Sequence, residues 1–328
     1  MNKFKVVVTD YTYESLDTEK KILSQSKLNI DFQDYQYRNG TEEQLIEIAK
    51  DCDVLIVQYA SITKHVIDSL NKCKMIIRYA IGVDNINLKA ATDKGIFVAN
   101  VPDYGIDEVS THTVALLLNA ARKLYQSIHM VKSKKWDYAQ VKPLRRTLGK
   151  RLGLVALGRI PSAVAKKMAG YGMDIVAYDP YVSKEYAERL GVKLVSFDEL
   201  IETSDYISIH CPLTEQTKYM FNMSVFERMK DTAVLINTAR GKIVNETDLA
   251  IACENKIIAA AALDVTEAEP ISYDSPLLTL DNVYITPHVA WYTEESIESL
   301  KTKLTEEVVR VLKDNIPVNL VNSEVLKK

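Results

Sequence analysis

The chain has 328 residues, 47% of them hydrophobic and 26% charged, which is an ordinary globular composition and enough length for two domains. A formal net charge of −3 provides no broad positive field, so we expect neither a nucleic-acid partner nor an anionic lipid surface. No apolar run approaches the ~18 residues of a membrane span, and the N-terminus enters a strand-like run without a signal-peptide pattern. These features predict a soluble, cytoplasmic protein without membrane contact.

The cysteines are far apart in the sequence and form no C-x-x-C pair: they are Cys52, Cys73, Cys211 and Cys253. This spacing favours reduced thiols over a disulfide framework or a zinc site. We therefore predict no metal site.

Short β-branched runs alternate with amphipathic segments in the first third of the chain. Strands are predicted at 4–9, 53–57, 74–78 and 96–98, and helices with threonine caps at 41–50 and 63–71. Such alternation predicts a parallel sheet with helices on both faces.

A second series of the same kind begins near Arg151. Strands are predicted at 152–157, 174–178, 206–209, 233–236, 258–263 and 283–285, with helices at 162–171 and 246–254. Residues 105–124 between the two series predict one long apolar helix. From Thr293 the pattern is again helical and ends in the extended segment IPVNLVN. The chain therefore reads as two α/β domains.

The segment ALGRIP (156–161) follows a predicted strand and precedes a helix, where a Rossmann unit carries G-x-G-x-x-G. Only the middle glycine, Gly158, is present. Ala156 can replace the first glycine if its φ is negative, at some steric cost, and Pro161 suits the first helical turn. Amides and the helix dipole at this point can bind phosphate.

Asp179 ends the next predicted strand, in AYDPY. An acid about 20 residues after the loop is the usual partner of the ribose hydroxyls, and its charge would repel the extra phosphate of NADP. The pair predicts NAD binding. The loop by itself also fits a glycine-poor turn followed by an ordinary strand-end aspartate.

Polar side chains follow three later strands, with Arg240 in NTARG, Asp264 and Glu269 in DVTEAEP, and His288 in TPH. Because the carboxyl ends of parallel strands line one edge of a sheet, we expect these side chains to converge. Singly, each has an ordinary alternative. A histidine after proline can be a satisfied turn residue, an arginine before glycine a surface charge, and the acidic segment a solvated turn.

Together their chemistry fits hydride transfer to a 2-oxo acid, which needs a proton donor and a cation for the carboxylate. Imidazole titrates near neutral pH, which suits His288 as general acid/base. Glu269 is expected on its other nitrogen, and Arg240 offers a planar fork for the carboxylate and carbonyl oxygens. Asp264 is a candidate acceptor for the nicotinamide amide.

Ordered motifs over nearly the whole chain resemble the D-isomer-specific 2-hydroxyacid dehydrogenases: RYAIGVDNINLKAATDKGIFVANVP (78–102), GLVALGRIPSAVAKKMAGYGMDIVAYDPY (153–181), HCPLTEQT (210–217), INTARGKIVNETDLA (236–250), AALDVTEAEP (261–270) and ITPHVAWYTEES (285–296). The resemblance implies Arg240, Glu269 and His288 as the catalytic set. It implies NAD contacts at Gly158, Arg159, Ile160, Asp179, Pro212, Thr217, Thr238 and Asp264.

Within that family the chain is most similar to the branch of the C-terminal binding proteins, through VQYA, RYAIG, EVSTHT, PLRRTLGK and HVAWY. This likeness implies that Trp291 closes the substrate pocket, although core packing is the alternative. It also implies that the amides of Ile81 and Gly82 bind the substrate carboxylate, where a simple strand-to-turn transition is the alternative. Ala156 and Ala80 depart from glycines common in the family.

The resemblance implies two Rossmann-like, doubly wound domains with a cleft between them. We expect a discontinuous substrate domain at 1–103 and 293–328, an NAD domain at 104–292, and a homodimer contact in 104–150. The predicted activity is NAD-dependent interconversion of a small D-2-hydroxy acid and its 2-oxo acid. An NADH-responsive interaction protein with little turnover is the alternative. Which acid is used, among glyoxylate, hydroxypyruvate, 3-phosphohydroxypyruvate and bulkier oxo acids, stays open.

Overall fold

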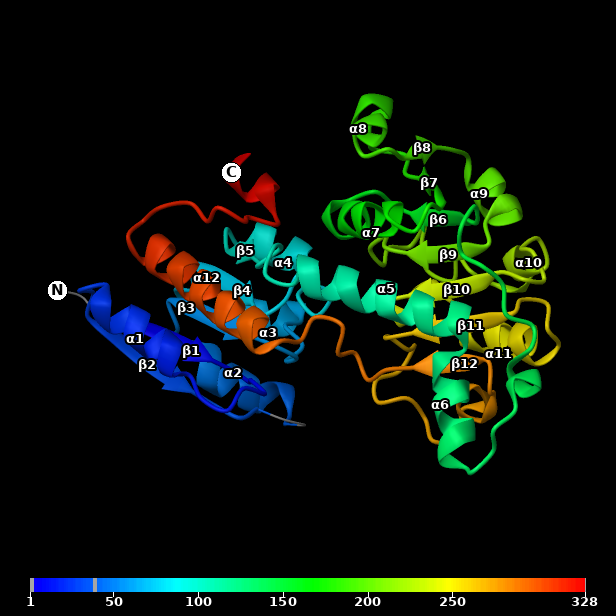
Figure 1. Ribbon diagram of the computed structural model, residues 1–328. Helices are drawn as coiled ribbons and strands as arrows, with labels where there is room; N and C mark the ends of the chain where they lie inside the picture. Colours follow the sequence, from blue (N-terminus) through cyan, green and yellow to red (C-terminus); the bar gives the residue numbers. More distant parts are fainter. Residues whose placement is uncertain (1–2, 38–39, 328) are drawn as a thin grey trace. The chain divides into compact units, whose positions relative to one another are not determined.

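The computed structural model describes residues 3–37 and 40–327. The chain forms two compact units (Figure 1). Unit 1 combines Met1–Gly105 with Thr293–Lys328, and unit 2 is the continuous stretch Ile106–Tyr292. Both are α/β units built on parallel sheets, which confirms the predicted fold class.

The sheet of unit 1 has the order β2-β1-β3-β4-β5, and the strands of each neighbouring pair are parallel. The strands are β1 (Phe4–Val8), β2 (Ile30–Asp34), β3 (Val54–Val57), β4 (Met75–Arg78) and β5 (Phe97–Ala99). Strand β3 is a wholly buried aliphatic run, and Val6 to Val8 of β1 and Met75 to Ile77 of β4 are also buried, as expected for strands covered on both faces.

Helices cover both faces of this sheet. On one face lie α2 (Glu42–Ala49), α3 (Lys64–Ser69) and α4 (Leu88–Asp93), whose buried side chains share a core with Val7, Leu55 and Ile76. On the other lie α1 (Asp17–Gln25) and α12 (Glu294–Leu312), drawn side by side in blue and orange in Figure 1. The sheet is therefore completed by a helix that follows unit 2 in sequence.

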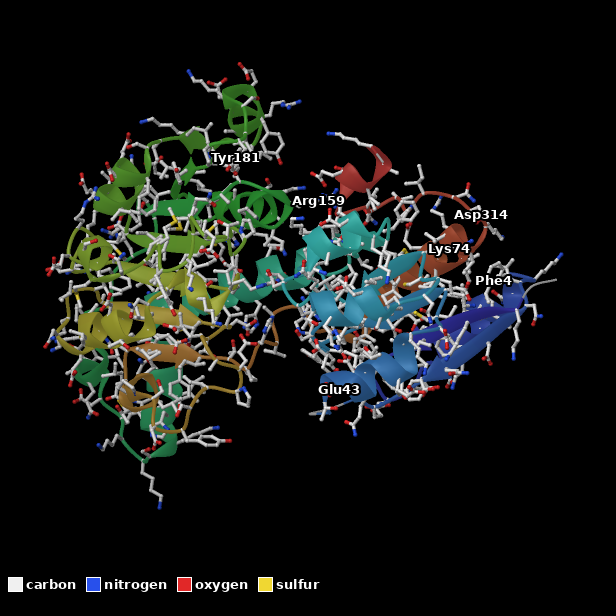
Figure 2. The ribbon with its side chains drawn as sticks, turned by 180° about the vertical axis from the view of Figure 1, so that it is seen from behind. Phe4, Glu43, Lys74, Arg159, Tyr181 and Asp314 are labelled. Atoms are coloured by element: carbon white, nitrogen blue, oxygen red, sulfur yellow. The ribbon has the colours of Figure 1, made fainter. Side chains whose placement is uncertain are left out.

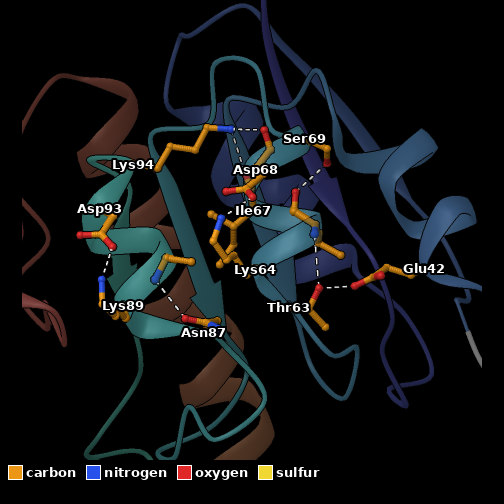
Figure 3. Close-up of polar contacts among 12 residues, drawn as sticks. Glu42, Thr63, Lys64, Ile67, Asp68, Ser69, Asn87, Lys89, Asp93 and Lys94 are labelled. Carbon is orange, nitrogen blue, oxygen red and sulfur yellow. Dashed lines mark hydrogen bonds and ion pairs between the residues drawn. The ribbon is translucent and has the colours of Figure 1, made fainter.

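Side-chain caps fix the helices that follow β3 and β4 (Figure 3). The Thr63 hydroxyl accepts a hydrogen bond from the amide of Val66 at 3.3 Å, and the Asn87 side chain accepts one from the amide of Ala90 at 3.0 Å. Lys94 donates to the carbonyl of Ile67 at 2.7 Å. Because caps satisfy amides that a helix start leaves unpaired, they define where the preceding loops end.

A charge contact holds the opposite end of the same sheet. Lys74 pairs with Asp314 at 2.7 Å and lies 5.6 Å from the ring centre of Phe4 (Figure 2). This contact ties the segment after α12 to the start of β4.

The sheet of unit 2 has the order β12-β11-β10-β9-β6-β7-β8, again with parallel neighbours. Its strands are β6 (Arg151–Val155), β7 (Asp174–Tyr178), β8 (Lys193–Leu194), β9 (Tyr206–Ile209), β10 (Val234–Asn237), β11 (Ala260–Leu263) and β12 (Val283–Ile285). The chain order reverses between β6 and β9, and ligands of open α/β sheets bind at such a switch point.

Unit 2 also has helices on both faces. One face carries α5 (Ile106–Arg122), α7 (Arg159–Ala169) and α8 (Lys184–Arg189), and the other α9 (Phe197–Thr203), α10 (Met223–Phe226) and α11 (Glu246–Glu254). The remaining helix α6 (Leu124–Lys132) buries none of its side chains. Short 3-10 helices lie at Tyr138–Val141, Gly241–Ile243, Pro276–Thr279 and, in unit 1, Ser323–Lys327.

The structure adds two strands to the predicted set and changes two predicted elements. Strands β2 and β8 were not predicted, and the long helix expected over 105–124 ends at Arg122. Lys123 then has φ of 47°, in the left-handed region, before α6 begins. The terminal segment predicted as extended forms one antiparallel bridge, between Leu320 and Ala99. Within residues 3–37 and 40–327, no helix combines the length and apolarity of a membrane span.

Candidate active site

The predicted phosphate loop lies between β6 and α7. Gly158 caps α7, and a Cβ atom there would meet no protein atom within 4 Å. In the described part of the chain, the amides of Arg159 and Ile160 donate to no other group. Pro161 lies in the first turn, as predicted. Unpaired amides beside a glycine with open space fit a bound pyrophosphate.

Ala156 does not meet the condition under which it could replace the first glycine. Its φ is +81°, in the left-handed region that favours glycine, rather than negative. The Ala156 amide donates to the carbonyl of Tyr178 at 2.8 Å, which holds the turn in this shape. The loop has therefore kept the backbone of a glycine while carrying a Cβ, at a strain of about 1–2 kcal/mol.

Asp179 lies at the end of β7, beside this loop. Its carboxylate accepts from the amide of Leu157 at 2.8 Å and from the amide of Tyr181 at 2.8 Å. Figure 2 labels Tyr181, on the loop after β7, and Arg159, at the start of α7. The carboxylate thus connects the two loops expected to hold the ribose and the pyrophosphate.

The other predicted cofactor residues occupy turns at the same sheet edge. The Thr217 hydroxyl donates to the carbonyl of Pro212 at 2.6 Å and closes the loop after β9. Thr238 follows β10, and its hydroxyl shares a hydrogen bond of 2.9 Å with Thr113 of α5.

His288 and Glu269 form the centre of the predicted catalytic set. The Nδ1 atom of His288 lies 2.6 Å from Oε2 of Glu269, and both side chains are about two-fifths exposed. The Nε2 atom of His288 has no hydrogen-bond partner among the described residues. One ring nitrogen is therefore fixed by a carboxylate while the other is available to a substrate.

Arg240 and His288 together set the charge of Glu269. Burial opposes ionisation of this carboxyl, but the hydrogen bond and charge of His288, with the amide of Thr266 and the charge of Arg240, hold its pKa below the ordinary value. Both other predicted catalytic side chains therefore act electrostatically on the Glu269 carboxylate.

Backbone packing brings Arg240 to this place. Asn237, wholly buried, donates to the carbonyl of Arg240 at 2.9 Å and so closes the turn after β10. A Cβ atom on the next residue, Gly241, would overlap the carbonyl group of Thr266. The NTARG turn can approach the segment that carries Glu269 only because residue 241 is a glycine.

A reciprocal clasp holds that segment from the other side. The Glu246 amide donates to the Glu267 carboxylate at 2.8 Å, and the Glu267 amide donates to the Glu246 carboxylate. Tyr219 adds a hydrogen bond of 2.9 Å to Glu267. Burial raises the pKa of Glu246. The acidic segment is therefore an anchored loop, not a solvated turn.

His288 itself has a strained backbone, with φ of 52°. Asp264, which is only 1% exposed, stabilises this backbone conformation. The backbone carbonyl of Asp264 accepts a hydrogen bond from the His288 amide at 2.8 Å. Its carboxylate accepts from the amides of Val289 and Ala290, each at 2.9 Å. The carboxylate is thus engaged by the protein, while contact with a nicotinamide remains a prediction.

Trp291 is half-buried. Its indole nitrogen donates to the carbonyl of His288 at 3.0 Å. The tryptophan thereby packs back on the catalytic loop, and its role in closing a pocket remains a prediction.

In unit 1 the loop after β4 carries Ile81 and Gly82. Asn100 donates to the carbonyl of Ile81 at 2.6 Å, and Arg78 donates to that of Gly82 at 2.8 Å. No acceptor in the described part of the chain lies within hydrogen-bond range of the two amides. Fixed carbonyls and unpaired amides make a site suited to a carboxylate. Ala80, before them, has no positive φ and is not strained.

Sequence reasoning missed Gly241, the Glu246–Glu267 clasp, and His112 and Thr113 on α5. The glycine stood in a quoted motif, so its position was a usable signal. The two α5 residues contact loops more than a hundred positions away, which no local pattern shows.

Comparisons with known proteins agree with this geometry. Residues 114–290 match the family described as D-isomer specific 2-hydroxyacid dehydrogenase, NAD binding domain. A D-3-phosphoglycerate dehydrogenase of Methanocaldococcus jannaschii is 42% identical over 86% of this chain and 54% of its own length. A glyoxylate reductase of Korarchaeum cryptofilum is 38% identical over 88% of both chains.

A solved structure supports the same family. The D-lactate dehydrogenase of Aquifex aeolicus, in complex with NAD and lactic acid, has a TM-score of 0.87 and 30% identity, covering 97% of this chain and 99% of its own. This chain spans 54% and 59% of the length of two D-3-phosphoglycerate dehydrogenases that it matches.

The parallel α/β units and the matched residues define the class: this chain belongs to the D-isomer-specific 2-hydroxyacid dehydrogenase family. Its unit 2 contains the NAD binding domain of that family.

Proposed function

We propose that the protein is an NAD-dependent dehydrogenase that interconverts a small D-2-hydroxy acid and its 2-oxo acid. The observation that carries this proposal is the 2.6 Å contact between His288 Nδ1 and Glu269, with Arg240 acting on the same carboxylate. A paired acid/base and a planar cation are what reduction of an oxo acid requires.

In this proposal each side chain has one task. His288 donates a proton from Nε2 to the carbonyl oxygen as it becomes a hydroxyl. Glu269 keeps the other ring proton on Nδ1 and stabilises the imidazolium. Arg240 binds the carboxylate and carbonyl oxygens of the substrate through its planar fork.

The residues after β6 and β7 would hold the cofactor. The amides of Arg159 and Ile160 fit the pyrophosphate, with Gly158 giving close approach. Asp179 would bind the ribose hydroxyls and favour NAD over NADP. When bound, NADH supplies the hydride for the oxo carbon.

The substrate's carboxylate also has a candidate site in unit 1, at the amides of Ile81 and Gly82. Their carbonyls are held by Asn100 and Arg78, so the amides are oriented before a ligand arrives. This supports the assignment of unit 1 as the substrate domain and unit 2 as the NAD domain.

The testing experiment follows NADH oxidation by absorbance with a panel of 2-oxo acids. The panel is glyoxylate, hydroxypyruvate, 3-phosphohydroxypyruvate and bulkier branched or thioether oxo acids. We expect turnover with at least one acid, and His288→Ala to lose it by at least about 10²-fold while still binding NADH. Unchanged turnover in the variant would remove His288 from the mechanism.

A second outcome separates this activity from the alternative. NADH binding without reduction of any acid would favour an NADH-responsive interaction protein of the kind found in the branch of the C-terminal binding proteins. Likeness to that branch stays a prediction, with Trp291 as its main residue.

We also propose a homodimer through the segment 104–150. The supporting observation is apolar exposure: α6 buries no side chain, and Tyr125, Trp136 and Leu148 are 61%, 90% and 62% exposed. Exposed apolar patches mark interaction surfaces. Sedimentation should give a dimer for the wild type and a monomer for Ile128→Glu.

A further inference from the structure

A chain of hydrogen bonds runs from α5 to the catalytic loop. The Nε2 atom of His112 lies 3.0 Å from the hydroxyl of Thr286, and that hydroxyl donates to the Asp264 carboxylate at 2.6 Å. Because the threonine proton is used toward Asp264, the proton between His112 and Thr286 belongs to the imidazole. His112 Nε2 also lies 3.5 Å from the same carboxylate oxygen.

The Asp264 carboxylate is what holds the strained loop. It accepts the amides of Val289 and Ala290, directly after His288, whose φ is 52°. A strained residue persists only where its surroundings over-determine it, so the direction of this carboxylate affects where the catalytic imidazole points. The side chains of Thr286 and His112 contact this carboxylate and fix its direction.

The same end of α5 reaches the neighbouring catalytic turn. Thr113, next to His112, shares a hydrogen bond of 2.9 Å with Thr238, two positions before Arg240. Thr113 is fully buried and also donates to the carbonyl of Val109 in its own helix at 2.7 Å. Helix α5 therefore contacts two of the three loops that deliver the proposed catalytic side chains.

We infer that His112 is a positioning residue that acts on His288 through Thr286 and Asp264. It touches neither reacting atom in this scheme. Its imidazole donates from Nε2, orients the threonine hydroxyl, and so keeps the Asp264 carboxylate facing the amides after His288. This inference rests on the proposed dehydrogenase activity.

The kinetic test compares His112→Ala and His112→Gln with the wild type on the best oxo acid of the panel. We expect His112→Ala to lower kcat by about tenfold with little change in KM or NADH affinity, because only the geometry of the proton donor changes. Glutamine keeps an N–H donor at similar reach, so His112→Gln should recover most of the rate. His65→Ala, at an exposed position of α3, is the matched control and should match the wild type.

A double variant tests the route. If His112 acts through Thr286, the double variant His112→Ala, Thr286→Val should have a kcat no lower than that of the slower single variant. The reason is that the effects of substitutions within one hydrogen-bond network do not add. Unchanged kcat in His112→Ala would overturn the inference. The inference would also be overturned if His112→Gln did not restore kcat and the effects of His112→Ala and Thr286→Val added fully in the double variant. That pattern would indicate only structural damage.

A spectroscopic measurement keeps the inference separate from the proposed function. Proton–nitrogen correlation spectra of histidine-labelled protein report the ring nitrogens of His288 without any turnover. His112→Ala should shift the His288 signals, and His65→Ala should not. Unmoved His288 signals would overturn the inference. If the signals shift but the protein reduces no oxo acid, the coupling between His112 and His288 stands and only the proposed dehydrogenase activity is refuted.

Discussion

Gly241 and Thr266 approach so closely that no side chain fits between them: a Cβ on Gly241 would overlap the Thr266 carbonyl group. The contact joins the turn of Arg240 to the segment of Glu269. It sets how near the cation lies to the carboxylate whose pKa it lowers.

Gly241→Ala should therefore separate these two segments. We expect a large loss of turnover and a destabilisation of about 1–3 kcal/mol, as for other overpacked sites. Turnover and urea unfolding measure the two effects. Gly158→Ala is the matched control, because its Cβ would meet no protein atom. It should leave stability nearly unchanged and weaken NADH binding. Equal behaviour of the two variants would contradict this distinction.

Ala156→Gly should stabilise the protein. It removes a Cβ from a residue with φ of +81°, and the gain exceeds the added freedom of the unfolded chain by about 1 kcal/mol. Urea unfolding at neutral pH measures the difference. Ala80→Gly, at a residue without positive φ, should instead lower stability slightly. A loss of stability in Ala156→Gly would show that the turn is not strained.

Glu269→Gln should lower turnover by roughly 10²-fold and also change the pH dependence of stability. The folded-state pKa of Glu269 lies below its ordinary value of 4.5. The ionised group therefore stabilises the folded state above the unfolded pKa, and that stability is lost as pH falls through the folded pKa. The stability difference between wild type and variant should be full near neutral pH and vanish in acid. Exposed Glu215→Gln should show no such difference.

His210 should make the protein sensitive to acid. Burial lowers the pKa of His210 to about 3, with Ser208 2.8 Å from Nε2. Below the ordinary pKa of 6.5 the unfolded chain binds a proton that the folded protein does not. As the pH decreases below 6.5, this residue should therefore lower the free energy of unfolding by about 1.4 kcal/mol for each pH unit. His210→Asn should flatten that decline in urea unfolding, whereas His129→Asn should keep it.

Most elements could be predicted because buried parallel strands are β-branched runs between capped helices. Strand β2 was missed because IDFQD is polar and only half-buried at the sheet edge, and β8 has only two residues. Arg240, Glu269 and His288 could be predicted to converge because each follows a strand of one parallel sheet, and the family resemblance supplied their roles. The φ of Ala156 could not be predicted, because it depends on a hydrogen bond to Tyr178. The role of His112 could not be predicted either, because it depends on a contact with Thr286, 174 positions away in the sequence.

The return of α12 to unit 1 has a consequence for synthesis on the ribosome. Unit 2 is continuous in sequence and can fold as soon as its last strand emerges. The first 105 residues appear earlier but lack the helix that packs against α1 and β4. Buried side chains such as Leu300, Leu304 and Val308 are synthesised only after all of unit 2. The first segment of unit 1 therefore cannot complete its packing until unit 2 has been made, and one face of its sheet lacks its helix until then.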